Sequence, residues 1–137
     1  MDKKELVLSN DVSEVSKIES FTEQIGEELS LSPAVVTSIN LALEEAIANV
    51  IMYAYPAPEK NKIHLFAELE NNELMFLLTD TGVPFDPTKD AKNPDITASV
   101  EDRPIGGLGI MLVKKIMNEV SYQRINGENQ LTLKKKI

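Results

Sequence analysis

One long apolar stretch between two prolines constrains the fold of this 137-residue chain more than any other feature. Ser32-Pro33 is typical of a helix start, because serine caps the first turn and proline is tolerated in it. Tyr55-Pro56 disfavours continuation, since the residue before a proline avoids the helical conformation. The sequence therefore predicts a helix over residues 33–55. At about 100° per residue, one apolar stripe runs along it through Val36, Ile39, Leu43, Ile47, Val50 and Ala54.

Two polar side chains lie on the other side of this predicted helix. Glu45 and Asn49 are four residues apart, so their heads lie one turn apart on the same side. A carboxylate and an amide in apolar surroundings need a partner, because burying a polar group without a hydrogen bond costs free energy. That partner is protein, water or a ligand, and the rest of the chain favours a ligand. Their neighbours on this side are Leu41, Ala42, Ala46 and Met52.

Charge and composition exclude several classes of protein. The formal charge of −8 disfavours nonspecific binding to nucleic acid or to an anionic membrane, but leaves room for a nucleotide site. The absence of cysteine excludes disulfides and thiolate metal sites. The first residues lack the apolar run of a signal peptide, and polar residues interrupt the stretch at 33–55, which is not expected to span a membrane. We expect one cytoplasmic domain over residues 1–137, with no direct contact to nucleic acid or membrane.

Hydrophobic periodicity and turn residues predict the element order β-α-α-β-β-loop-α-β-β. This order favours an α+β fold, a two-layer sandwich with helices on one face of a mixed, mostly antiparallel sheet. The expected strands are 4–9, 63–70, 73–79, 120–125 and 130–135, and the expected helices run from Asn10 or Asp11 to about residues 28–30, over 33–55 and over 107–118.

A long segment from Thr81 to Ile105 has no convincing periodicity and contains four prolines and four aspartates. Connections in compact domains are usually about four to six residues, and longer ones are commonly lids or disordered segments. Because glycines stand at both ends, we interpret residues 82–106 as a lid that closes over a site. A disordered insertion is the alternative.

The start of this segment, Asp80-Thr81-Gly82, follows a predicted strand, so the Asp80 carboxylate is expected at one end of the sheet. A carboxylate only accepts hydrogen bonds and suits an exocyclic amino group such as that of adenine. Gly82 lets a flat group approach the backbone where a Cβ would collide. Taken alone the motif has low specificity, because aspartate and glycine are common in turns.

The end of the segment, Gly106-Gly107-Leu108-Gly109, precedes the third predicted helix. Backbone amides at a helix start, free of side chains, form an anion site whose usual occupant is phosphate. The alternative is a flexible turn with a close helix crossing, because so short a glycine motif is not specific. No Lys-Ser or Lys-Thr follows the glycines, so the P-loop pattern is excluded.

The three motifs, in this order, resemble those of the GHKL ATPases, which share the Bergerat ATP-binding fold, and among them the small anti-sigma factor serine-protein kinases. Residues 45–49, EAIAN, resemble the N box of this family. Residues 80–86, DTGVPFD, resemble its first glycine box. Residues 106–110, GGLGI, resemble its second glycine box. Tyr53 departs from the family, in which many members have histidine at this position.

The resemblance implies ATP and Mg²⁺ as cofactors and a role for each matching residue. Asn49 would ligate Mg²⁺, which also bridges the phosphates. Glu45 would act as the general base that takes the proton from an incoming serine hydroxyl. Asp80 would accept a hydrogen bond from the adenine amino group, and Gly82 would let the base pack.

The phosphates would bind to backbone amides of the second glycine box, at Gly106, Gly107, Leu108 and Gly109. Arg103 could reach the terminal phosphate, and an ordinary surface arginine is the alternative interpretation.

Val83 and Pro84 stand where sensor histidine kinases usually place a second glycine, which favours the serine-kinase branch. The resemblance thus implies an ATP-dependent serine/threonine kinase that phosphorylates a STAS-type anti-anti-sigma protein and sequesters a sigma factor, and it implies a homodimer. Two alternatives remain open. One is an ATP-gated binding module without phosphotransfer, and the other is an ATP-binding catalytic module for a separate histidine-phosphotransfer protein.

Overall fold

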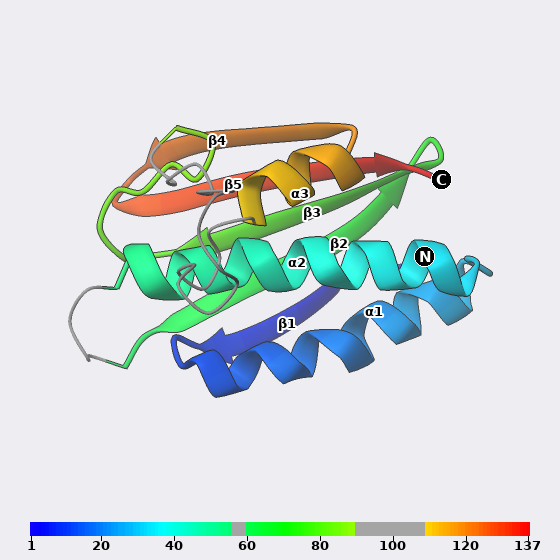
Figure 1. Cartoon of the computed structure of the whole chain (residues 1–137), viewed down its shortest axis with the longest axis horizontal. Coiled ribbons are helices and arrows are strands. Elements are labelled where there is room, and N and C mark those ends of the chain that lie inside the picture. The colour runs from blue at the N-terminus through cyan, green and yellow to red at the C-terminus, as the bar shows by residue number, and fades with distance from the viewer. Residues whose placement is uncertain (56–59, 90–108) are drawn as a thin grey trace, which may run out of the picture.

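The computed structural model of the chain describes residues 1–55, 60–89 and 109–137. Within them, a layer of helices covers one face of a five-stranded sheet (Figure 1), which confirms the α+β class and the two layers. In chain order the elements are β1 (Lys4–Ser9), the 3₁₀ helix η1 (Val12–Ser16), α1 (Lys17–Glu28), α2 (Pro33–Tyr53), β2 (Lys62–Glu70), β3 (Glu73–Asp80), α3 (Gly109–Ile116), β4 (Glu119–Ile125) and β5 (Glu128–Lys136).

The sheet has the strand order β1-β2-β3-β5-β4. Its four strand pairings within the described residues are all antiparallel, where a mixed, mostly antiparallel sheet was expected. Both tight hairpins contain left-handed residues: Asn71 and Asn72 have φ of 51° and 61°, and Asn126 and Gly127 have 52° and 77°. Two consecutive positive φ angles are typical of the type I′ turn, whose twist matches that of paired strands.

The bounds of the helices differ in detail from those expected. The first predicted helix is divided, because the Asp11 side chain accepts a hydrogen bond from the Ser13 amide and caps η1, and α1 begins only at Lys17. The helix α2 starts where predicted, with the Ser32 hydroxyl accepting from the Val35 amide at 3.3 Å. It ends two residues earlier than expected, and α3 ends at Ile116 where 118 was predicted, while residues 107 and 108 of the predicted helix lie outside the described residues.

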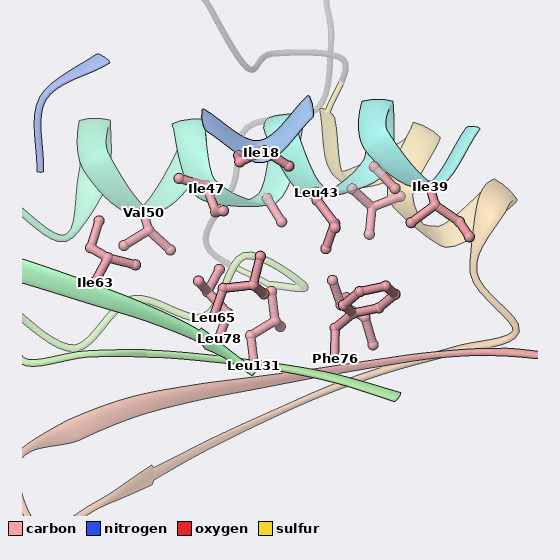
Figure 2. Packing of buried hydrophobic residues seen from close by; sticks show 14 of the residues in the cluster. Ile18, Ile39, Leu43, Ile47, Val50, Ile63, Leu65, Phe76, Leu78 and Leu131 are labelled. Atoms are coloured by element: carbon pink, nitrogen blue, oxygen red, sulfur yellow. The ribbon is translucent and has the colours of Figure 1, made fainter. Parts of the chain in front are cut away.

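The core lies between α2 and the sheet. Figure 2 shows the α2 side chains of Ile39, Leu43, Ile47 and Val50 pointing toward the inner face of the sheet. By length and composition α2 could cross a membrane, with a mean hydropathy of 1.4, but half of that stretch is buried within the protein. We therefore assign α2 as the core helix of this domain. Facing it on the sheet are the side chains of Ile63, Leu65, Phe76, Leu78 and Leu131.

The helix α2 lies between α1 and α3 and contacts both (Figure 1). On the α1 side, a Cβ added to Gly26 would come within 2.3 Å of Cγ2 of Val36, so the two helices approach closely at this glycine and a larger residue would displace the Val36 side chain. The Thr22 hydroxyl of α1 donates to the Asn40 side-chain oxygen of α2 at 3.1 Å. This hydrogen bond marks the side of α2 that faces α1.

Candidate functional site

The N-box residues lie on the side of α2 that faces away from α1. Asn49 follows Asn40 by nine residues, which is about 180° around a helix at about 100° per residue. Because Asn40 is hydrogen-bonded to α1 and α1 and α3 flank α2, Asn49 faces toward α3. Glu45 lies one turn before Asn49 on the same side. The sequence prediction that these two side chains share one side of a helix agrees with this arrangement.

The Asn49 side chain is fully buried, with 0% of its surface exposed. Neither its Oδ1 nor its Nδ2 has a hydrogen-bond partner among the residues that the structure describes. A buried amide without partners is costly, typically about 1–3 kcal/mol, so Asn49 is suited to a ligand that supplies the missing interaction. Its oxygen fits Mg²⁺, a cation that prefers oxygen ligands.

A Mg²⁺ ion at Asn49 would need further ligands. The described residues contain no group of three or more His, Cys, Asp or Glu side chains that could hold a metal. Mg²⁺ usually keeps several waters and is shared with substrate phosphates rather than enclosed by protein side chains. The residues present therefore fit a Mg²⁺ ion that arrives with a nucleotide, and do not form a metal site of their own.

Glu45 is half-buried, and this burial raises the pKa of its carboxyl above the ordinary value of 4.5. The neighbouring charge of Glu44 raises the pKa further. Glu44 itself is engaged within α2, where its carboxylate accepts a hydrogen bond from Asn40 Nδ2, one turn before it, at 3.0 Å. A carboxylate with a raised pKa is a stronger base, so Glu45 has the property that a general base requires.

Asp80 is the last residue of β3 and is only 3% exposed. Its Oδ1 accepts two hydrogen bonds of 2.9 Å, from the Gly82 amide and from Asn129 Nδ2. Burial raises the pKa of Asp80, while these hydrogen bonds and the charge of Arg124 lower it. Oδ2 accepts no hydrogen bond from the described residues, so among them it is open to a donor such as an exocyclic amino group.

The Asp80-Thr81-Gly82 turn packs against the end of α2. The amide of Val83 donates to the Ala54 carbonyl at 2.8 Å, and the amide of Thr81 donates to the Tyr55 hydroxyl at 3.1 Å. A Cβ added to Gly82 would lie 2.4 Å from that Ala54 carbonyl oxygen. The sequence suggested that Gly82 leaves room for a base, whereas the contact that requires glycine in this structure is with α2.

These contacts give the order of three of the predicted site residues along the axis of α2. Asp80 lies beside the Ala54 end of the helix. Asn49 precedes Ala54 by five residues, about 7.5 Å along the axis at 1.5 Å per residue, and Glu45 is one turn farther. An extended ligand that reaches from Asp80 along α2 would meet an acceptor first, then the unpartnered amide, then the basic carboxylate.

The first part of the predicted lid packs as part of the domain body. Phe85 is buried and its ring stacks on Tyr53, with the ring centroids 5.1 Å apart. The Phe85 amide donates to Asn129 Oδ1 at 3.3 Å. The departure at Tyr53 thus has a structural use, because this aromatic ring holds the segment that follows Asp80. The rest of the predicted lid, from residue 90 to 106, lies outside the described residues.

The second glycine box is described only at its end. Arg103, Gly106, Gly107 and Leu108 all lie outside the described residues, so their predicted roles are not tested. Gly109 is the first residue of α3, and α3 contacts α2. The chain therefore returns to the N-box helix at the position where the motif ends.

Sequence reasoning did not identify Asn129 and Arg124 as part of this site. Asn129 lies directly opposite Asp80 in the register of β3 and β5, and Arg124 Nη1 donates to the Gly82 carbonyl at 2.7 Å. Asparagine is common in and near turns, so a residue two positions after the Asn126-Gly127 turn does not stand out as part of a site. The missing signal was the register between two strands far apart in the sequence.

The chain is similar to known proteins in family, in sequence and in structure. The family model of the histidine kinase-like ATPase domain matches residues 8–135. The chain is 33% identical over 96 residues to the serine/threonine-protein kinase BtrW of Bordetella bronchiseptica, covering 70% of this chain and 67% of that protein. It is 29% identical over 102 residues to the serine-protein kinase RsbW of Bacillus thuringiensis, covering 72% of this chain and 63% of that protein.

The chain thus spans about two thirds of the length of these curated relatives. Among solved structures, it matches the crystal structure of the RsbU and RsbW domains of Rv1364c from Mycobacterium tuberculosis with a TM-score of 0.69. That match covers 99% of this chain and 32% of the other, at 14% identity, and it concerns the fold alone.

Proposed function

We propose, from the premise that this chain belongs to the histidine kinase-like ATPase domain family, that it is an ATP-dependent protein serine/threonine kinase. The family match and the curated relatives confirm the resemblance to the GHKL ATPases and to their serine-kinase branch. The relatives are named serine kinases. Because the chain spans only part of their length, the activity, substrate and partners of those proteins are carried to this chain as a proposal.

The observation that supports this proposal most is the environment of Asn49. Its buried amide lacks hydrogen-bond partners among the described residues and stands one turn from Glu45, whose pKa is raised. An enzyme that transfers phosphate needs a metal ligand and a base side by side, and the end of the same helix contacts the turn that carries Asp80. This arrangement suits a bound nucleotide better than a purely structural polar pair.

Each side chain has a distinct part in the proposed reaction. When bound, Mg²⁺-ATP supplies the phosphoryl group and the charge that stabilises its transfer. Asp80 Oδ2 accepts a hydrogen bond from the adenine amino group, and Asn49 Oδ1 is a ligand for the metal. The Glu45 carboxylate takes the proton from the hydroxyl of the acceptor serine, while the serine oxygen forms its bond to the terminal phosphorus and the bond to the bridging oxygen breaks.

The proposed acceptor is a serine of a STAS-type anti-anti-sigma protein, and the proposed second partner is a sigma factor that the kinase sequesters. Both partners are proposed from the resemblance of the three motifs to the anti-sigma factor kinases, and the names of the relatives support the serine-kinase activity. A homodimer in the cytoplasm, with no direct contact to nucleic acid or membrane, completes the proposal. The net charge of −8 agrees with it, because an acidic surface disfavours nucleic acid and anionic lipid.

A phosphotransfer assay tests the proposal. The full chain is incubated with Mg²⁺, ATP labelled in its terminal phosphate and the STAS protein encoded nearby. Acid-stable label on a serine of the partner is the expected result. Binding of ATP without transfer would instead support the ATP-gated binding module. Acid-labile label on a histidine would support the catalytic module for a separate histidine-phosphotransfer protein.

The Glu45→Gln variant tests the role of the base. It is expected to bind ATP as tightly as the wild type and to lose transfer by about 100-fold or more, the usual contribution of a general base. A matched control is Glu70→Gln, at the exposed end of β2, which removes the same charge far from α2 and is expected to retain full activity. Full transfer by Glu45→Gln would refute the assignment of the base.

A further inference from the structure

Asn129, in β5, makes four hydrogen bonds that join β3, β4 and the turn after Asp80, and it is only 4% exposed. Its Nδ2 donates to Asp80 Oδ1 and to the Val83 carbonyl, both at 2.9 Å. Its Oδ1 accepts from the Phe85 amide at 3.3 Å and from the Tyr122 hydroxyl. A side-chain amide has two N–H donors and an oxygen with two lone pairs. The four contacts therefore use the whole hydrogen-bonding capacity of Asn129.

These contacts fix which way round the Asn129 amide lies. The Phe85 amide can only donate and the Val83 carbonyl can only accept, so a flipped Asn129 would set like groups against each other on both sides. Asp80 Oδ1 consequently always meets an N–H from Asn129, in addition to the N–H of Gly82. A proton on Oδ1 would face two donors and have no acceptor. Asn129 thus keeps this oxygen unprotonated, and because N–H donors favour the charged form of a carboxyl, it also disfavours a proton on Oδ2.

We propose, on the basis of the ATP site proposed above, that Asn129 is a positioning residue that holds Asp80 as a pure hydrogen-bond acceptor and thereby makes the site select adenine over guanine nucleotides. Adenine carries an amino donor where guanine carries a carbonyl acceptor. Oδ2 of an ionised Asp80, which accepts no hydrogen bond from the described residues, pairs with the first and repels the second. A proton on Oδ2 would let Asp80 donate to the guanine oxygen, so discrimination depends on keeping the carboxyl ionised, which the N–H donors on Oδ1 favour.

The surroundings of Asp80 show why such a device is needed. Burial is the largest influence and raises the pKa of Asp80, which on its own would favour the protonated form. The hydrogen bonds described above and the charge of Arg124 lower the pKa, and Glu128 raises it. Among the described residues, the charge of Asp80 also acts on the hydroxyls of Tyr55 and Tyr122, whose pKa values burial raises, so they are neutral at physiological pH.

The Asn129→Asp variant tests the inference, because it keeps the shape of the side chain and replaces the donating nitrogen with oxygen. Two carboxylates at hydrogen-bond distance cannot both ionise and have to share a proton. Calorimetry with Mg²⁺-ATP and Mg²⁺-GTP on the full chain is expected to show about a tenfold or larger loss in the ratio of ATP to GTP affinity.

The same variant is expected to show a pH dependence that a merely structural role would not produce. Its ATP affinity should rise as the pH is lowered through the pKa of the shared proton, because that proton restores a donor toward Asp80 Oδ1. The wild type has a permanent N–H there and should lack this dependence. A variant with the wild-type affinity ratio and no added pH dependence would overturn the inference while the proposed kinase function stands.

Gln130→Ala is the matched control. Gln130 is the next residue of β5, so its side chain lies on the opposite face of the sheet, where it accepts from Gln123 Nε2 at 2.8 Å. We expect wild-type affinities for both nucleotides in this variant. If the wild type binds ATP and GTP equally, the inference about Asn129 is overturned and the proposed kinase function stands. If the wild type binds neither nucleotide, the proposed function is overturned as well.

If Asn129→Asp does not fold, nuclear magnetic resonance of the wild type decides the matter. The two side-chain amide protons of Asn129 are in different hydrogen bonds, so we expect two separate signals that exchange slowly with water. ATP should shift the signal of the proton that faces Asp80, and GTP at the same concentration should shift it less. Rapid exchange, or equal shifts with both nucleotides, would overturn the inference.

Discussion

The carbonyl oxygen of Ala54 lies where the side chain of residue 82 would begin: a Cβ added to Gly82 would stand 2.4 Å from it. The same oxygen accepts the Val83 amide at 2.8 Å. One backbone carbonyl at the end of α2 therefore fixes the distance between the helix that carries the N box and the turn that carries Asp80. The geometry of the proposed site depends on this contact more than on any side chain within it.

The Gly82→Ala variant should separate these two elements. The added methyl group overpacks the contact, which typically costs about 1–3 kcal/mol, and moves Asp80 relative to Asn49. We expect a lower melting temperature and an ATP affinity reduced by about tenfold, as follows from about 1.4 kcal/mol of lost binding energy. Thermal unfolding and calorimetry measure the two effects.

Gly26→Ala is the control for this variant. Its added Cβ would lie 2.3 Å from Cγ2 of Val36, so it crowds the α1–α2 contact in a similar way but away from the site. We expect it to lose stability and to keep its ATP affinity. If both glycine variants bound ATP like the wild type, the proposed dependence of the site on the Gly82–Ala54 contact would be wrong.

Asp80→Asn should stabilise the protein and impair nucleotide binding. Burial raises the pKa of Asp80 above its ordinary value of 3.8, so the folded state holds this proton more tightly than the unfolded state. The contribution of such a group to stability is greatest below that value and falls as the pH rises through the folded pKa. At neutral pH the buried charge therefore destabilises, and a neutral amide does not.

The amide oxygen that this substitution introduces can still accept from Gly82 and Asn129, but an amide nitrogen replaces the acceptor that would face adenine. We expect a free energy of unfolding higher by about 1 kcal/mol at neutral pH, with weaker ATP binding. The gain should shrink as the pH falls toward 3.8. Denaturant unfolding at several pH values measures it, with Asp2→Asn, an exposed charge at the N-terminus, as control. A loss of stability at neutral pH would contradict the prediction.

The helix α2 could be predicted because its signals are local. Ser32, the following proline and the apolar stripe all lie within the segment itself, and the structure places the helix at Pro33–Tyr53 against the predicted 33–55. The hairpin turns were equally readable, since Asn126-Gly127 adopts the positive φ angles that this dipeptide favours. In both cases the neighbouring residues alone decide the local conformation.

The contacts of the site could not be predicted, because they join residues far apart in the sequence. Asn129 meets Asp80 across 49 positions, and that meeting requires the register of β3 on β5. The burial of Asn49 depends on how α3 and the rest of the chain cover α2, which no periodicity records. Sequence motifs identified the polar groups and the order in which they occur, whereas tertiary packing determines which of them meet.

Ser32→Ala should weaken α2 at its start and leave the chemistry intact. The Ser32 hydroxyl accepts from the Val35 amide at 3.3 Å, and losing such a cap typically costs about 1 kcal/mol. The site lies at the other end of the helix, so the ATP affinity of the folded protein should not change. Ser32→Asp is the control, because aspartate also caps a helix and should retain the stability measured by thermal unfolding. Equal stability of all three proteins would show that the cap contributes nothing.

Glu44→Gln should shift the pH dependence of phosphate transfer. Burial and then the charge of Glu44 raise the pKa of Glu45. Transfer requires Glu45 to be ionised if it is the base, so its rate should rise with pH through that pKa. Removing the charge of Glu44 lowers the pKa of Glu45, and the rising part of the profile should move to lower pH. The shift should be only partial, because burial, the larger cause, remains.

Single-turnover transfer measured across the acidic range tests this shift, with ATP kept saturating so that binding does not limit the rate. Glu70→Gln serves again as the control, since it removes the same charge from the exposed end of β2 and should leave the profile where it is. A profile of Glu44→Gln that coincides with the wild type would mean that the neighbouring charge does not act on the base. A profile displaced to higher pH would contradict the assignment of Glu45 as the group that titrates, because loss of a nearby negative charge can only make that carboxyl easier to ionise.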